Sequence, residues 1–121
     1  MARAKDVMGG GFSAGQALAL AGTISSAVSA AGTTISDATD LTASINVITT
    51  CAAGAGVQLP SCDVGDEIEV LNLGAGAGYV YPYTSEQINA LSANKGFVLA
   101  PNTAVKLRKF TTTRWVGWLS A

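Results

Sequence analysis

A serine inside a glycine-flanked pentapeptide is the first feature of this sequence that could do chemistry. Residues 11–15 read Gly-Phe-Ser-Ala-Gly and match the G-x-S-x-G string of a nucleophile elbow. The serine of an elbow needs a histidine to accept its proton, and the 121-residue chain contains none. The elbow also needs a preceding strand, and none is predicted here. We therefore interpret the pentapeptide as part of a glycine-rich arm, and we expect no catalytic residue and no enzyme.

Four carboxylates lie close together in the sequence: Asp63, Asp66, Glu67 and Glu69. Their oxygens could hold Ca²⁺, but the EF-hand spacing is missing and Glu67 and Glu69 project from the same face of a predicted strand. As an acid and base pair for glycoside cleavage they lack an aromatic sugar platform nearby in the sequence. A solvated strand face and its preceding turn explain them equally well. The lack of histidine and of C-x-x-C spacing argues against zinc, so we expect no bound metal.

The glycine run at residues 74–78, Gly-Ala-Gly-Ala-Gly, superficially resembles a dinucleotide-binding loop. It lacks the third glycine at the required spacing, and it joins two predicted strands instead of a strand and a helix. The chain also has no Walker A sequence. We interpret the run as a turn and expect no nucleotide or other cofactor.

Cys51 and Cys62 are the two cysteines of the chain. One potential pair in a chain of this size is not a disulfide framework. We expect both residues to be reduced and to lie near turns, with a disulfide between them as the less favoured alternative.

Three tyrosines at alternate positions are the main candidates for recognition. Tyr79, Tyr81 and Tyr83 share one face of a predicted strand, because side chains alternate between the two faces. Such a ladder can bind carbohydrate, or it can cover a core edge or a subunit contact. We favour the core and interface interpretation, because the chain has few other large side chains.

Composition limits the partners that this chain can recognise. Its net charge is −1 and only 12% of its residues are charged, so nothing favours nucleic acid or an anionic membrane as a partner. Aromatic residues make up 7%, which predicts a thin core that partner subunits help to stabilise. The basic start of the chain imitates a secretory signal, but Asp6 interrupts it, and no run of about 18 apolar residues predicts a membrane span.

The elements expected to position these residues fall into two parts. Residues 1–37 are rich in Gly, Ala, Ser and Thr, and no charged residue occurs from Val7 to Ser36. A segment without charges or large side chains cannot fold alone, so we expect an extended arm, with a possible short helix at residues 13–20, that orders against a neighbouring subunit or a larger surface. Its apolar residues are the expected contacts with the partner: Phe12, Leu18, Leu20, Ile24, Val28 and Ile35.

From residue 38 to 121 the pattern predicts a β domain. Seven or eight short strands recur about every ten residues, separated by Gly, Pro and Asn. This spacing is typical of a small antiparallel β-sandwich, a jelly roll or a jelly-roll-like barrel. The basic cluster Lys106, Arg108 and Lys109 is interpreted as the solvent face of one of these strands.

Several motifs in the β domain resemble a module of tailed-bacteriophage virion proteins. The matching strings are INVITT at 45–50, VQLP at 57–60, VGDEIEVLNLG at 64–74, VYP at 80–82 and INAL at 88–91, followed by a closing strand with tryptophan. The opening at residues 5–22 is similar to that of phage head proteins. Cys51 and Cys62 are not part of the family pattern.

The resemblance implies a β-sandwich-like domain found in capsid decoration (cement) proteins, head fibres and tail-associated proteins, and it implies no catalytic residues. We expect a decoration protein on the capsid surface of a virion assembled in the host cytoplasm. It would bind the major capsid protein lattice and associate with itself, with a homotrimer as the expected state. A head-fibre or tail-associated subunit is the alternative, and a carbohydrate-binding adhesion module is the alternative from another class.

Overall fold

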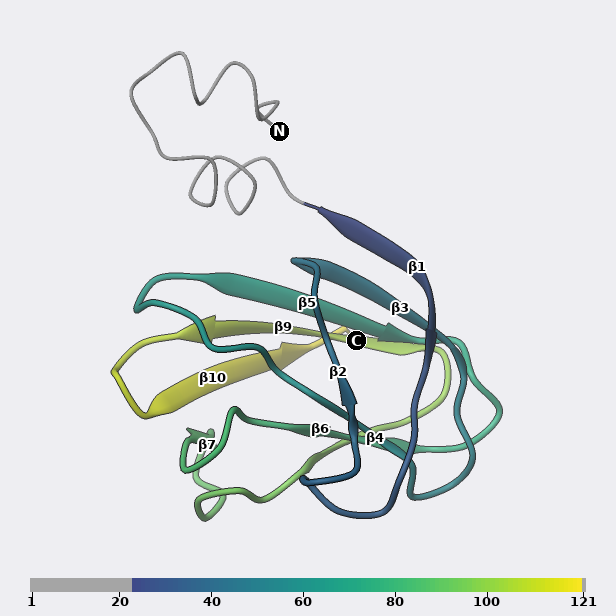
Figure 1. Cartoon of the computed structure of the whole chain (residues 1–121). Helices are drawn as coiled ribbons and strands as arrows, with labels where there is room; N and C mark the ends of the chain where they lie inside the picture. Colours follow the sequence, from purple (N-terminus) through teal and green to yellow (C-terminus); the bar gives the residue numbers. More distant parts are fainter. Residues whose placement is uncertain (1–22, 121) are drawn as a thin grey trace.

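The computed structural model describes residues 23–120, and every regular element in this range is a β-strand. The all-β prediction is confirmed, and this part of the chain has no helix long and apolar enough to cross a membrane. The strands follow one another along the chain (Figure 1): β1 (Ile24–Ser29), β2 (Thr39–Asp40), β3 (Ile45–Thr50), β4 (Gly56–Gln58), β5 (Glu67–Asn72), β6 (Gly78–Tyr81), β7 (Gln87–Ile88), β8 (Phe97–Leu99), β9 (Thr103–Lys109) and β10 (Arg114–Leu119).

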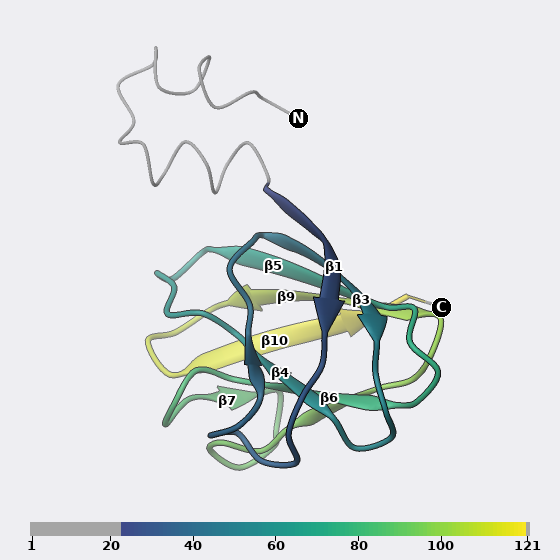
Figure 2. The same ribbon diagram turned by 45° about the vertical axis from the view of Figure 1, so that its right-hand side comes forward.

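The strands form two sheets that lie on opposite sides of the core. One sheet has six strands in the order β1-β3-β5-β9-β10-β7, and the other has four in the order β2-β4-β6-β8. From β1 to β6 the chain moves from one sheet to the other at every step, as the turned view in Figure 2 shows. Each strand therefore lies beside the strand two steps earlier and runs parallel to it. These successive coils make the fold β-solenoid-like.

The prediction of an antiparallel sandwich or jelly-roll-like barrel is wrong in this respect. Alternating side chains report which face of a strand is buried, and they say nothing about which strand lies beside it. Parallel neighbours need a long connection, and here the intervening strand in the opposite sheet supplies it. Among the strands of residues 23–120, antiparallel pairs occur in the second half of the chain, where β8 returns along β6, β9 along β5 and β10 along β9.

The small residues between strands lie where successive coils stack. The turn after β5 lies directly against the turn after β3, so a Cβ atom on Gly74 would come within 2.5 Å of the Cys51 Cβ. A Cβ on Gly76 would collide with the backbone at Ala53. Asn72 holds this turn from inside, because its Nδ2 donates to the carbonyl oxygens of Gly76 and Leu99 at 3.0 Å. The predicted turn at residues 74–78 is confirmed, and its composition follows from the close stacking.

The core consists of the inward-facing residues of both sheets. On β5 these are Ile68, Val70 and Asn72, the three residues that the alternation placed on one face, and all three are buried. Trp115 on β10 and Val57 on β4 are fully buried members of the same core cluster. Burial of each large apolar side chain contributes about 1.5–3 kcal/mol, which compensates for the scarcity of aromatic residues.

The described part of the predicted arm is built into the first coil. β1 pairs with β3 along the edge of the six-stranded sheet, and the loop after it is held by Asp37. The Asp37 carboxylate accepts hydrogen bonds from the backbone amides of Thr33 and Thr34 and from the Thr34 hydroxyl, and these bonds lower its pKa. Gly32 has a φ of 72° beside this carboxylate. The predicted boundary between arm and β domain at residue 37 therefore separates β1 from β3, the strand that it pairs with. The possible helix at residues 13–20 lies outside the described residues.

Candidate interaction surfaces

The structure describes three of the six predicted partner-binding residues of the arm, and these three differ in exposure. Phe12, Leu18 and Leu20 lie outside the described residues. Of the others, Ile24 is 65% exposed at the start of β1, and Val28 is buried in the core with 8% exposed. Ile35 is half-buried in the loop after β1.

β1 is the longest free edge in the described part of the chain. The other edge strands, β2, β7 and β8, have two or three residues, whereas β1 has six. Natural proteins protect sheet edges with charges, prolines or short strands, and β1 (Ile-Ser-Ser-Ala-Val-Ser) has none of these. Its backbone is therefore open to pairing before Ser29, whose carbonyl accepts a hydrogen bond from the Thr39 hydroxyl at 2.6 Å. Shifts in the register with β3 interrupt the ladder.

A hollow of about 320 Å³ opens between β1 and β2 at the same end of the solenoid. Its walls are mostly small and polar, with Val28 and Leu41 as apolar residues and Asp40 as the only charge. Asn46 also lines it, and the Oδ1 of this buried residue accepts no hydrogen bond from residues 23–120. An unpaired buried acceptor costs about 1–3 kcal/mol. The lining residues are Ser25, Ala27, Val28, Ser29, Thr39, Asp40, Leu41, Thr42 and Asn46.

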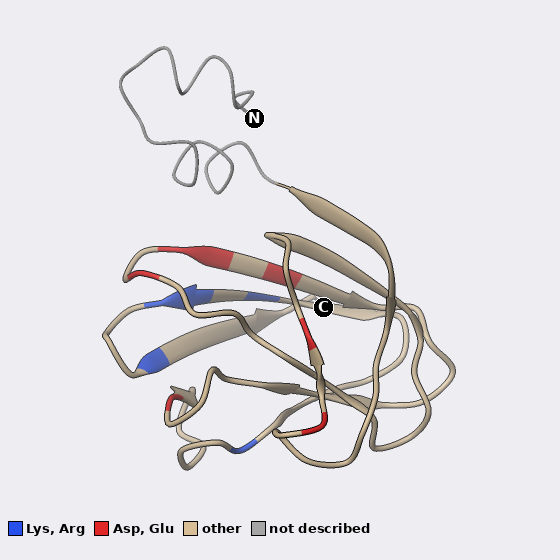
Figure 3. Cartoon of the chain, in the orientation of Figure 1, with Lys and Arg blue, Asp and Glu red and all other residues tan. Residues whose placement is uncertain are grey.

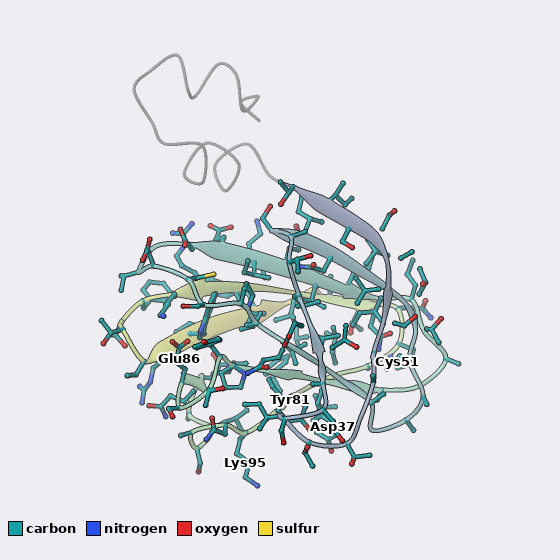
Figure 4. All side chains as sticks on the ribbon, in the orientation of Figure 1. Asp37, Cys51, Tyr81, Glu86 and Lys95 are labelled. Atoms are coloured by element: carbon teal, nitrogen blue, oxygen red, sulfur yellow. The ribbon has the colours of Figure 1, made fainter. Side chains whose placement is uncertain are left out.

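The three tyrosines are only partly available for recognition. Tyr79 and Tyr81 share the outer face of β6, as predicted, with ring centroids 5.9 Å apart. Tyr81 is buried, because its ring covers Gly56 and its hydroxyl donates to the Thr33 carbonyl at 3.3 Å. Figure 4 shows Tyr81 beside the Asp37 loop. Burial raises the Tyr81 pKa.

Tyr83 follows Pro82 beyond the end of β6 and is 41% exposed. The ladder is therefore broken in the middle, and Tyr81 lines no open platform. This arrangement agrees with its interpretation as a residue that covers the sheet.

A buried ion pair occupies the end of the core next to β7. Lys109 was expected on a solvent face, and this prediction is wrong: the residue is 5% exposed and its Nζ lies 2.8 Å from the Glu86 Oε2. The same Nζ donates to the Cys62 carbonyl at 2.8 Å, and the Trp115 Nε1 donates to the Glu86 Oε1 at 2.8 Å. Every charge is thus paired inside the core, so the cluster serves to join β7, β9 and β10. The sequence signal for this burial was the spacing of two residues that puts Lys109 on the same face of β9 as Val105 and Leu107.

The acidic and basic residues outside the core form neighbouring stripes on the six-stranded sheet (Figure 3). Glu67 on β5 pairs with Arg108 on β9 and lies 3.8 Å from the Lys106 Nζ. The Asp66 carboxylate accepts a hydrogen bond from the Asp63 amide and shapes the turn before β5. Among residues 23–120 no group of three or more side chains is placed to hold a metal ion.

The cysteines are both free thiols. Cys51 is buried beneath the stacked turns, which raises its pKa. Burial, reinforced by the charge of Asp66, raises the Cys62 pKa to about 11. A thiol with so high a pKa stays protonated at neutral pH and is a poor nucleophile.

The two tryptophans of β10 face opposite sides of the sheet. Trp115 is fully buried, whereas Trp118 is 50% exposed and meets the ring of Phe110 edge-on, with centroids 6.1 Å apart. This outward aromatic pair lies beside the charged stripes. The sequence indicated it only by the alternation within β10.

Comparison with known protein families, with curated proteins and with solved structures finds no match to this chain.

Proposed function

We propose that this protein is a structural, non-catalytic component of a virion: a capsid decoration (cement) protein that binds and stabilises the lattice of the major capsid protein. In this role it associates with itself, acts at the capsid surface and is assembled in the host cytoplasm. The sequence resemblance described above supports the virion setting. The fold supports a role in attachment, because the charge-free segment joins the β domain as the edge strand β1.

The observation that carries the proposal is the position of β1. The chain from Val7 to Ser36 carries no charge, and it enters the body along the longest open edge, next to the hollow. An open strand edge can add a strand from a partner, and main-chain hydrogen bonds then supply affinity without charged side chains. A large, fixed protein surface such as a capsid lattice suits this mode of attachment.

The proposal is tested with the full chain and with capsids from which the protein has been removed. Ala27 is exposed in the wall of the hollow, so Ala27→Arg should fill it and lower the number of copies bound. Ala100→Arg is the matched control, because Ala100 is also exposed and follows the edge strand β8 of the other sheet. Equal binding of both variants would place attachment elsewhere. A wild-type chain that binds no capsid would reject the decoration role.

Copy number separates this role from the alternatives. A decoration protein covers the head in hundreds of copies, whereas a head-fibre or tail-associated subunit is present in a handful. Quantitative mass spectrometry of purified virions gives this number directly. An adhesion module would instead bind glycans and lose that binding on substitution of the exposed Tyr79 or Tyr83.

A further inference from the structure

The outer face of the six-stranded sheet has an order of side chains that is complementary to itself. One row crosses the sheet through residues that the strand registers place side by side: Ile24 on β1, Ile45 on β3, Glu69 on β5, Lys106 on β9 and Trp118 on β10. The row thus reads apolar, apolar, acidic, basic, aromatic. None of its side chains is buried in the core.

We infer that this face binds the same face of a second copy of the chain about a two-fold axis. The axis would run along the strands between β5 and β9. A rotation of 180° about it places β5 over β9 of the other copy and β3 over β10. Glu69 then faces Lys106 of the second copy, and Ile45 faces its Trp118. Both contacts occur twice, as an isologous interface requires.

Charge complementarity is the argument for a second copy as the occupant. The next row repeats the pattern, because Glu67 pairs with Arg108 and Arg108 with Val116. Acidic and basic stripes of equal length lie on opposite sides of the same axis, so two copies meet with unlike charges at every position. An axis through β5 or through β9 would instead place each charged stripe against its own copy, and like charges that face each other cost affinity.

The apolar ends of the row supply the area that charge pairs alone do not. Exposed ion pairs contribute little net affinity, whereas partly exposed aromatic residues dominate interface energetics. Trp118 is 50% exposed and would be covered by Ile45 of the second copy, whereas Ile24, 65% exposed, lies at the margin of the contact. The pairing gives a dimer, in contrast to the homotrimer expected from composition and resemblance.

Charge reversal in the full chain tests the inference. Glu69→Lys places lysine against Lys106 of the second copy at two symmetric points, and Lys106→Glu places two carboxylates together. Each variant alone should raise the dimer dissociation constant more than about tenfold in sedimentation analysis. Mixed in equal amounts, they should form heterodimers with near wild-type affinity, because lysine at position 69 then meets glutamate at position 106 and the reverse.

The mixture separates contact between chains from repulsion within one chain. Residues 69 and 106 are also neighbours within each copy, and mixing leaves that internal contact unchanged. Lys95→Glu, an exposed charge reversal in the turn before β8 (Figure 4), should leave the dimer intact. Failure of the mixture to restore dimers would overturn the inference. So would a wild-type chain that sediments as a monomer or as a trimer at about 100 μM, roughly a hundred times a micromolar dissociation constant.

Discussion

Lys109 gives the sharpest test of how this fold is held together. The residue is 5% exposed, its Nζ lies 2.8 Å from the Glu86 Oε2, and among residues 23–120 its other acceptor is the Cys62 carbonyl. Lys109→Met keeps most of the aliphatic volume but removes the charge. Glu86 is then left in the core with the Trp115 N–H as its remaining partner. Removing one partner of a buried pair costs about 3–5 kcal/mol.

The loss should be large in an unfolding experiment. For a domain of this size, about 1 kcal/mol corresponds to a shift of about 4–8 °C in Tm, so Lys109→Met should lower Tm by at least about 12 °C. Urea unfolding monitored by tryptophan fluorescence gives the free energy directly, because Trp115 lies in the cluster. Lys95→Met is the control. Lys95 is exposed in the turn before β8 and lies outside the proposed dimer face, so its substitution should change stability by less than about 0.5 kcal/mol.

A second substitution decides whether the charges act as a pair. Glu86→Gln in the Lys109→Met background removes the stranded charge and keeps an acceptor for the Trp115 N–H. The double variant should therefore be more stable than Lys109→Met, with a coupling energy of about 1–3 kcal/mol. The reasoning is refuted if the two losses simply add, or if Lys109→Met costs no more than the Lys95→Met control.

Three other outcomes follow from local contacts. Gly74→Val should lower the free energy of unfolding by about 1–3 kcal/mol in urea titration, because its Cβ would meet Cys51, whereas the exposed Ala75→Val should not. The pKa of Asp37 lies below its usual 3.8, so the ionised carboxylate stabilises the fold above that pH, and this stabilisation is lost as the pH falls through the lowered value. Thermal melts should therefore show an acid loss of stability in the wild type and a smaller loss in Asp37→Asn. With a pKa of about 11, Cys62 should react slowly with iodoacetamide at pH 8 and about tenfold faster per pH unit towards 11, and a rate that is flat with pH would contradict this value.

The sequence predicts the strands of this fold far better than their neighbours. The alternation of Ile68 and Val70 with Glu67 and Glu69 identifies β5 and its buried face, and the structure confirms both. Nothing in that alternation indicates whether β3 or a hairpin partner lies beside β5. The stacking of Gly74 on Cys51 joins residues of different coils, so the turn composition was visible but its cause was not.

The candidate surfaces show the same limit. A lysine usually lies at the surface, but the spacing of Lys109 within β9 places it on the core face. Its burial depends on the partner Glu86, which lies 23 residues earlier in the chain and cannot be identified from the local pattern. The row that ends at Trp118 requires the registers of four strand pairs, none of which can be read from a linear pattern. The absence of charge from Val7 to Ser36 predicted that this segment contacts a partner, and the open edge strand β1 lies within it.

The two proposed contacts use different parts of the molecule, so they can operate together and fail separately. Ala27 lines the hollow between the sheets, whereas Glu69 and Lys106 lie on the outer face of one sheet. Ala27→Arg should reduce capsid binding and leave the dimer intact. The charge-reversed variants should weaken the dimer and leave capsid binding intact when few capsid sites are occupied. Ile24 belongs to β1 and also ends the row, so it is the one residue through which self-association could order the open edge. If Ile24→Asp weakens both the dimer and capsid binding while Ala27→Arg weakens only the second, pairing of two copies would be the step that prepares β1 for the lattice.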